Sequence, residues 1–183
     1  ILEEYMRDRQ GNEEGYVLDI ARDQEYEELH VSRLGEHTRA FIKVQDGCNQ
    51  FCSYCIIPYA RGRVRSRKPE DVVAEVEGLV ARGYREVVLT GIHLSSYGTE
   101  HMEGSPVKGG DWDSGPLWDL IERIHRVEGL KRIRLGSLEP RIITEEFAGK
   151  LAGLPEFCPH FHLSLQSGCD ATLKRMNRHY TTE

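Results

Sequence analysis

The most informative stretch of this chain reads Cys48-Asn49-Gln50-Phe51-Cys52-Ser53-Tyr54-Cys55, which places three cysteines within eight residues. It follows a strand-like run at residues 38–45. Four thiolates complete the coordination of a cubane iron–sulfur cluster or a structural zinc ion, so three at this spacing indicate a metal site with one open coordination position. An iron atom with an open position can bind a substrate.

Other functions of the three cysteines remain possible, namely a zinc site, a redox dithiol or a disulfide. A zinc ion would need a fourth ligand, which His30, His37 or His93 could supply. The Cys-x3-Cys step is unlike the usual zinc pairs, and no second cysteine pair stands at the spacing of a finger or ribbon. A non-catalytic electron-transfer module would need a fourth cysteine near the other three, and none closely follows Cys55.

The composition indicates a globular enzyme of a reducing compartment. The chain has 183 residues, of which 39% are hydrophobic, enough for one sizeable core. It contains no apolar run of the roughly 18 residues that would predict a membrane span, and no signal-peptide pattern. Unpaired cysteines fit a reducing environment, so we predict a cytoplasmic protein without membrane contact. Cys158 and Cys169 have no ligand spacing, and we interpret both as ordinary residues.

The charge is segregated along the chain. The net charge of −6 argues against a protein wholly devoted to nucleic acid, and acidic residues crowd the first thirty positions. Five basic residues follow the cysteines, namely Arg61, Arg63, Arg65, Arg67 and Lys68. Such a basic run next to a reactive centre could hold the phosphates of RNA or of a nucleotide. The alternative is a solvated surface loop.

Helical and strand patterns alternate after the cysteines. Pro69 and two carboxylates suit a first helical turn, apolar residues then recur at helical spacing, and Gly83 follows the last turn. We further predict strands at 86–91, 132–138 and 160–166, helices at 116–128 and 144–152, and a last helix with Asp170 as its N-cap. This order predicts βαβ units and a parallel sheet, either a barrel or an open doubly wound sheet. Four strands are too few for a complete eight-stranded barrel.

Candidate ligand-binding residues follow these strands, because ligands of parallel βα folds bind at the carboxyl ends of the strands. The segments at these ends are the cysteines, Thr90-Gly91-Ile92-His93, Ser137-Leu138-Glu139-Pro140 and Ser164-Leu165-Gln166-Ser167-Gly168. Their polar side chains are either ligand contacts or caps and turns. The glycine-rich residues 97–116 predict a loop, either a substrate lid or a surface insertion.

Several motifs resemble those of the radical S-adenosylmethionine (SAM) methylthiotransferases, which replace C–H by C–S–CH3 on tRNA bases or a ribosomal protein. These motifs are the cysteine stretch with Tyr54, Lys43-Val44-Gln45-Asp46-Gly47-Cys48, Ile56-Ile57-Pro58-Tyr59-Ala60-Arg61-Gly62, Ser66-Arg67 and Leu163-Ser164-Leu165-Gln166-Ser167-Gly168. The resemblance covers most of residues 37–183. The run Thr90-Gly91-Ile92-His93-Leu94-Ser95-Ser96-Tyr97-Gly98 is most similar to the branch that acts on N6-threonylcarbamoyladenosine 37 of tRNA.

The resemblance implies an α/β fold of the partial, three-quarter βα-barrel kind, truncated after about four βα units. Residues 1–37 would be an acidic linker after a missing N-terminal domain, and residues 38–183 a radical SAM core that is incomplete at its C-terminus. The chain would therefore be a fragment. The missing N-terminal domain would carry a second, auxiliary 4Fe–4S cluster.

The resemblance also implies the cofactors and the residues that bind them. Cys48, Cys52 and Cys55 would hold a 4Fe–4S cluster whose open iron binds SAM. The SAM-binding residues would be Tyr54, Thr90, Gly91, Glu139, Gln166 and Ser167, with Ser137 as a further candidate.

The implied reaction inserts sulfur and a methyl group at C2 of the modified adenosine through a 5′-deoxyadenosyl radical. The partners would be tRNA and an electron donor, a flavodoxin-like protein or another reductant. Alternatives are a methylthiotransferase for isopentenyladenosine tRNA or a ribosomal protein, a radical SAM enzyme of different chemistry, and a non-catalytic iron–sulfur or zinc module.

Overall fold

The fold is built on a largely parallel sheet in the computed structural model, which describes residues 20, 22, 25–27, 38–101 and 115–183. The main sheet has the strand order β2-β1-β3-β4. Strands β1 (Ala40–Asp46), β3 (Glu86–Gly91) and β4 (Arg132–Leu135) run parallel, as predicted. The short strand β2 (Arg65–Ser66) pairs antiparallel with β1, so part of the basic run is an edge strand.

One face of this sheet packs against three helices, α3 (Pro69–Ala81), α4 (Gly115–His125) and α5 (Glu145–Ala152). Alternate side chains of β1 point to that face, because Ala40 and Ile42 are buried whereas Phe41 between them is 51% exposed. The predicted starts of α3 and α5 are confirmed, because each depends on residues of the first helical turn. Pro69 occupies the first turn of α3, and the Thr144 hydroxyl accepts a hydrogen bond from the Phe147 N–H at the start of α5.

The predicted strand at 132–138 is broken at Gly136 into two strands of different sheets. β4 pairs with β3, whereas β5 (Ser137–Leu138) pairs in parallel with β6 (His162–Leu163). The Gly136 N–H donates to the Leu89 carbonyl at 2.8 Å, and a Cβ on Gly136 would lie 3.2 Å from that oxygen. The chain therefore passes too close to β3 at this point for a side chain to fit easily. Strand β6 covers only two residues of the predicted 160–166.

The last helix begins at the predicted Asp170, but Asp170 is its first residue and not its N-cap. Helix α6 spans Asp170–Arg175, and its N-cap residue is Cys169, which makes no side-chain capping hydrogen bond. The Asp170 carboxylate instead accepts a hydrogen bond from the Thr182 N–H at 2.8 Å. Of the predicted loop at 97–116, residues 102–114 lie outside the described residues, as does most of the predicted acidic linker at 1–37.

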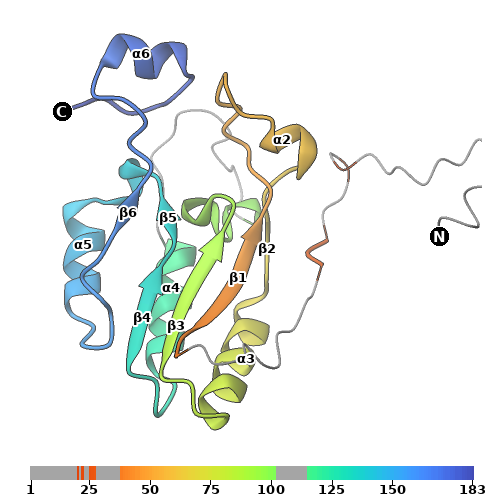
Figure 1. Cartoon of the computed structure of the whole chain (residues 1–183), viewed down its shortest axis with the longest axis vertical. Helices are drawn as coiled ribbons and strands as arrows, with labels where there is room; N and C mark the ends of the chain where they lie inside the picture. Colours follow the sequence, from red (N-terminus) through yellow and green to blue (C-terminus); the bar gives the residue numbers. More distant parts are fainter. Residues whose placement is uncertain (1–19, 21, 23–24, 28–37, 102–114) are drawn as a thin grey trace, which may run out of the picture.

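The carboxyl ends of the parallel strands meet at one end of the molecule. Figure 1 shows α2 (Ile57–Ala60) and α6 at this end, at the top of the view. Three 3₁₀ turns lie between the larger elements, at Leu94–Ser96, Thr99–His101 and Pro140–Ile142. None of the helices in the described ranges combines the length and the hydropathy needed to cross a bilayer.

Candidate functional site

The three cysteines line one cavity at the carboxyl ends of the strands. Its volume is about 170 Å³. The lining residues are Cys48, Gln50, Cys52, Tyr54, Cys55, Ile57, Ile92, His93, Ser137, Leu138, Glu139, Ser164, Gln166 and Arg178. The structure thus brings the cysteines and Tyr54 together with Ser137, Glu139 and Gln166 from two later parts of the sequence.

The loop that carries the cysteines is attached to β1 by a turn that requires glycine. Gly47 has a φ of +68°, and a Cβ there would lie 1.7 Å from the Arg63 carbonyl oxygen. The next residue, Cys48, donates its N–H to the Gly62 carbonyl at 3.1 Å. The end of β1 and the segment after β3 are joined by the buried Gln45 amide, whose Oε1 accepts the His93 N–H at 2.7 Å. Gln45 belongs to the motif at residues 43–48, but the sequence alone predicts no role for it.

The thiols of this loop are largely shielded from water. Cys48 and Cys52 are buried and Cys55 is half-buried. Burial raises the pKa of Cys48 to about 11, so its free thiol is protonated at neutral pH and a metal would have to displace the proton. Two donors point at sulfur, because the Gln50 N–H lies 3.5 Å from Cys48 Sγ and Arg178 Nη1 lies 3.4 Å from Cys52 Sγ. The Gln50 contact favours the Cys48 thiolate over its thiol, although burial has the larger effect on the pKa of Cys48.

Among the described residues, no three Cys, His, Asp or Glu side chains are arranged to hold a single metal ion. A cubane cluster binds each thiolate through a different iron atom, so its protein ligands do not converge on one point. Three shielded thiols on one cavity wall, two of them with donors to sulfur, fit such a cluster.

A buried carboxylate lines the same cavity as these thiols. Glu139 is 2% exposed, and its carboxylate lies 3.4 Å from His93 Nε2, 3.3 Å from Arg141 Nη2 and 3.7 Å from Arg178 Nη2. Burial alone raises the pKa of Glu139, but these three partners outweigh it and hold the pKa below its usual value. Glu139 is therefore ionised at neutral pH. Glu139 is a predicted site residue, whereas Arg141 and Arg178 are not, because no motif of charged residues in the sequence marks them.

Three predicted SAM-binding residues, Thr90, Gly91 and Ser167, are not among the residues that line this cavity. The Thr90 hydroxyl donates to the Ile42 carbonyl at 3.2 Å, and Gly91 lies against the Gln45 side chain. The Ser167 hydroxyl accepts the Cys169 N–H at 3.2 Å. Gln166 does line the cavity, from an exposed position with a φ of +65°.

The structure corrects the prediction for two residues of the basic run. Arg65 and Arg67 are buried, so they do not offer their guanidinium groups to a phosphate on the surface. Arg67 Nη1 pairs with Glu75 at 2.5 Å, and Arg65 Nη2 lies 3.9 Å from Asp46. The other three basic residues, Arg61, Arg63 and Lys68, are exposed.

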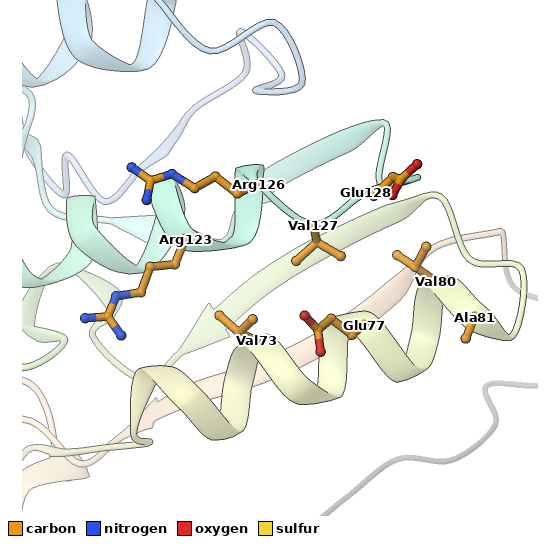
Figure 2. A pocket seen from close by; sticks show the side chains of 8 residues that line it. All are labelled: Val73, Glu77, Val80, Ala81, Arg123, Arg126, Val127 and Glu128. Atoms are coloured by element: carbon orange, nitrogen blue, oxygen red, sulfur yellow. The ribbon is translucent and has the colours of Figure 1, made fainter.

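A second and larger hollow, of about 570 Å³, lies between α3 and α4 (Figure 2). Its walls consist of Val73, Glu77, Val80, Ala81, Arg123, Arg126, Val127 and Glu128. Arg123 and Arg126 already pair with glutamates, at 2.8 Å from Glu70 and from Glu122. This hollow contains none of the predicted site residues, so the smaller cavity with the three thiols is the candidate site.

Comparisons with known proteins relate the sequence of this chain to a family. The sequence pattern of the Radical SAM superfamily matches residues 42–183. Threonylcarbamoyladenosine tRNA methylthiotransferase MtaB of Bacillus subtilis (strain 168) is 46% identical over 167 residues, 91% of this chain and 35% of that protein. tRNA-2-methylthio-N(6)-dimethylallyladenosine synthase of Caldicellulosiruptor saccharolyticus is 39% identical over 169 residues, 91% of this chain and 34% of that protein.

The structural comparison agrees on the fold. The radical S-adenosylmethionine methyltransferase TsrM from Kitasatospora setae superposes with a TM-score of 0.56 at 24% sequence identity, over 78% of this chain and 26% of that one. The chain spans about a third of the length of the curated relatives named above.

Proposed function

This chain belongs to the Radical SAM superfamily, and from that premise we propose that it is the catalytic core of a tRNA methylthiotransferase. The observation that carries the proposal is the single cavity at the strand ends that three thiols and one ionised carboxylate line. The proposed substrate is N6-threonylcarbamoyladenosine 37 of tRNA, and the 46% identity to the Bacillus subtilis relative supports this choice.

In the proposed site, Cys48, Cys52 and Cys55 hold a 4Fe–4S cluster that leaves one iron for SAM. A cluster held there would supply the reducing electron for radical chemistry on SAM, directed at C2 of the adenosine. Cys48 and Cys52 keep their sulfurs away from water by their burial. Tyr54 and Gln166 line the cavity and would contact SAM, and Glu139 adds a negative charge to the cavity lining beside Arg178.

The remaining predicted residues, Thr90, Gly91 and Ser167, have no side-chain contact with SAM in this proposal. They position the backbone around the cavity. At the end of β3, the Thr90 hydroxyl contacts the Ile42 carbonyl and Gly91 contacts Gln45, both in β1. These contacts keep the backbone after β3 close to the end of β1, from which the cysteine loop starts. Ser167 shapes the turn before α6.

We propose that the fold is a partial βα barrel of about four units. The alternation of β1, β3, β4 and β6 with α3, α4 and α5 supports it. Residues 1–37 would then link a core at 38–183 to an N-terminal domain that holds the auxiliary cluster, which agrees with the share of the relatives that the chain spans. A flavodoxin-like protein or another reductant would supply electrons, and the reaction would take place in the cytoplasm, where thiols stay reduced.

Reconstitution tests the proposed cluster. Anaerobic treatment of the protein with iron and sulfide should load about four irons per chain on this loop, and Cys52→Ala should abolish the loading. Cys158→Ala is the matched control, because Cys158 is buried but does not line the cavity, and it should load as the unmodified protein does. Stoichiometric zinc without cluster uptake would contradict the proposal.

A second substrate, dimethylallyladenosine in tRNA, is favoured by the 39% identity to the Caldicellulosiruptor enzyme. The full-length protein can be assayed with two tRNAs that carry either threonylcarbamoyladenosine or dimethylallyladenosine, followed by mass spectrometry of the nucleosides. We expect the methylthio group on threonylcarbamoyladenosine alone.

A further inference from the structure

The chain directly after α6 lies against the loop of cysteines, defined here as the cysteine loop, residues 48–55. Ser53 donates its N–H to the Met176 carbonyl at 3.1 Å. The side-chain amide of Asn177 donates from Nδ2 to the Gln50 carbonyl at 3.1 Å and to the Phe51 carbonyl at 3.0 Å. The last two contacts join residues that are 127 and 126 positions apart in the sequence.

The backbone at Asn177 has the conformation that aims its amide at this loop. Helix α6 ends at Arg175, and Asn177 then adopts a φ of +57°, which asparagine tolerates better than most residues. Phe51, whose carbonyl accepts one of the two hydrogen bonds, also has a positive φ, of 49°. A single amide therefore satisfies two carbonyls at a point where the cysteine loop turns sharply.

Arg178 makes a second contact, to a sulfur atom. Its Nη1 donates to Cys52 Sγ at 3.4 Å, and its Nη2 donates to the Ser164 carbonyl at 3.1 Å. The side chain is 6% exposed, Glu139 Oε1 lies 3.7 Å away, and the Tyr180 ring lies 5.1 Å from the guanidinium carbon. A carboxylate, a carbonyl and a ring thus hold the guanidinium in one orientation, with a fixed cation facing Cys52.

We propose that residues 176–178 are a latch that positions the cysteine loop. Asn177 holds the backbone of the loop, and Arg178 holds the Cys52 sulfur and donates to it. The part that concerns Arg178 rests on the proposed function, because it describes Cys52 as a ligand of the cluster. Hydrogen bonds to ligand sulfurs help to set the reduction potential of a cluster, because they stabilise the more negative, reduced form.

Hydrogen–deuterium exchange on the metal-free protein tests the backbone part of the latch. Asn177→Gly removes the amide but keeps a residue that adopts a positive φ freely. We expect faster exchange in peptides of residues 48–55 and unchanged exchange in α3 and β3. Arg175→Met is the control, because Arg175 is exposed and its guanidinium bonds only to Thr172 Oγ1 in the described structure, so it should exchange as the unmodified protein does. Unchanged exchange of residues 48–55 in Asn177→Gly would overturn the latch.

A redox titration of the reconstituted protein, without SAM, tests the sulfur contact. Arg178→Met should shift the midpoint potential of the cluster to a more negative value, and Arg178→Lys, which keeps the positive charge, should give an intermediate value. Arg175→Met should leave the potential unchanged. Equal potentials for Arg178→Met and the unmodified protein would overturn the role of Arg178. If the protein binds no cluster at all, the proposed function fails, whereas hydrogen exchange of the metal-free protein still decides whether the latch exists.

Discussion

Gly47 tolerates no side chain at the point where β1 passes into the cysteine loop. Its φ of +68° is unfavourable for other residues, and the nearest atom to an added Cβ is a backbone oxygen, which moves only if the whole turn moves. We expect Gly47→Ala to lower the free energy of unfolding by about 1–3 kcal/mol or more, measured by urea denaturation.

Gly149→Ala is the matched control for this substitution. Gly149 lies inside α5, and an added Cβ meets nothing within 4 Å. Alanine should therefore raise the stability by about 0.5–1 kcal/mol, because it favours the helix. Similar effects of the two substitutions would mean that the Gly47 turn is not the constraint described above.

Glu139 makes the stability depend on pH. Its folded pKa lies below the ordinary value of 4.5, so its contribution is present above that value and is lost as the pH falls through the lower folded pKa. At pH 7 we expect Glu139→Gln to cost roughly 3–5 kcal/mol, because it leaves buried cations without their carboxylate.

The measurement is the unfolding free energy of Glu139→Gln and of the unmodified protein between pH 3 and 7. The difference between the two proteins should shrink as the acid end is reached, while Glu145→Gln, which changes an exposed residue of α5, should show little difference at any pH. A difference that stays constant over this range would rule out Glu139 as the titrating group.

At the level of elements, one ion pair joins helix α3 to Arg67, the residue directly after the edge strand β2. The Arg67 side chain is 2% exposed and that of Glu75 is 7% exposed, and the Tyr97 hydroxyl donates to the Arg67 carbonyl at 2.7 Å. The basic run is therefore partly an internal structural element, although its charges suggested a surface.

We expect Arg67→Met to destabilise the protein by about 3–5 kcal/mol, because it removes one charge of a buried ion pair. Arg63→Met, four residues earlier, should change the stability by less than about 0.5 kcal/mol, because Arg63 is exposed. Thermal or urea unfolding compares the two. A neutral Arg67→Met would return this arginine to the set of candidate phosphate contacts.

In the whole molecule, part of the exposed basic run lies beside the cysteine loop, because the guanidinium carbon of Arg63 lies 4.5 Å from the centre of the Phe51 ring. Arg61 pairs with Asp46 at 2.5 Å, so we choose Arg63 and Lys68 as the probes of RNA binding. We expect the double reversal Arg63→Glu and Lys68→Glu to weaken tRNA binding by the full-length enzyme and to flatten its salt dependence, by about 0.7–0.9 in slope per lost contact.

SAM cleavage in the absence of tRNA should survive this double reversal. The matched control reverses two exposed charges at the opposite end of the sheet, Arg82→Glu and Lys131→Glu, and should bind tRNA with little change. If SAM cleavage falls together with tRNA binding, the two residues support the site or the fold and do not dock RNA.

The sequence by itself determined the features that depend on neighbouring residues. The bounds of β3 agree with the predicted 86–91 at both ends, and α3 begins at the predicted Pro69, because caps, turn residues and periodicity act within a few positions. The spacing of the three cysteines and the family they indicate are local in the same way. Glu139 was found because the carboxyl end of a parallel strand is a known place for ligands.

Tertiary structure alone decided what depends on contacts between distant segments. The strand breaks at Gly136 because the chain approaches β3 closely there, and no local sequence pattern predicts this approach. Arg65 and Arg67 are buried because β2 pairs with β1, which turns a charged run inward. Arg178 meets Cys52 although 126 residues separate them. Periodicity and spacing report which residues are near in sequence, whereas the free energy of a buried charge depends on the partners that folding brings to it.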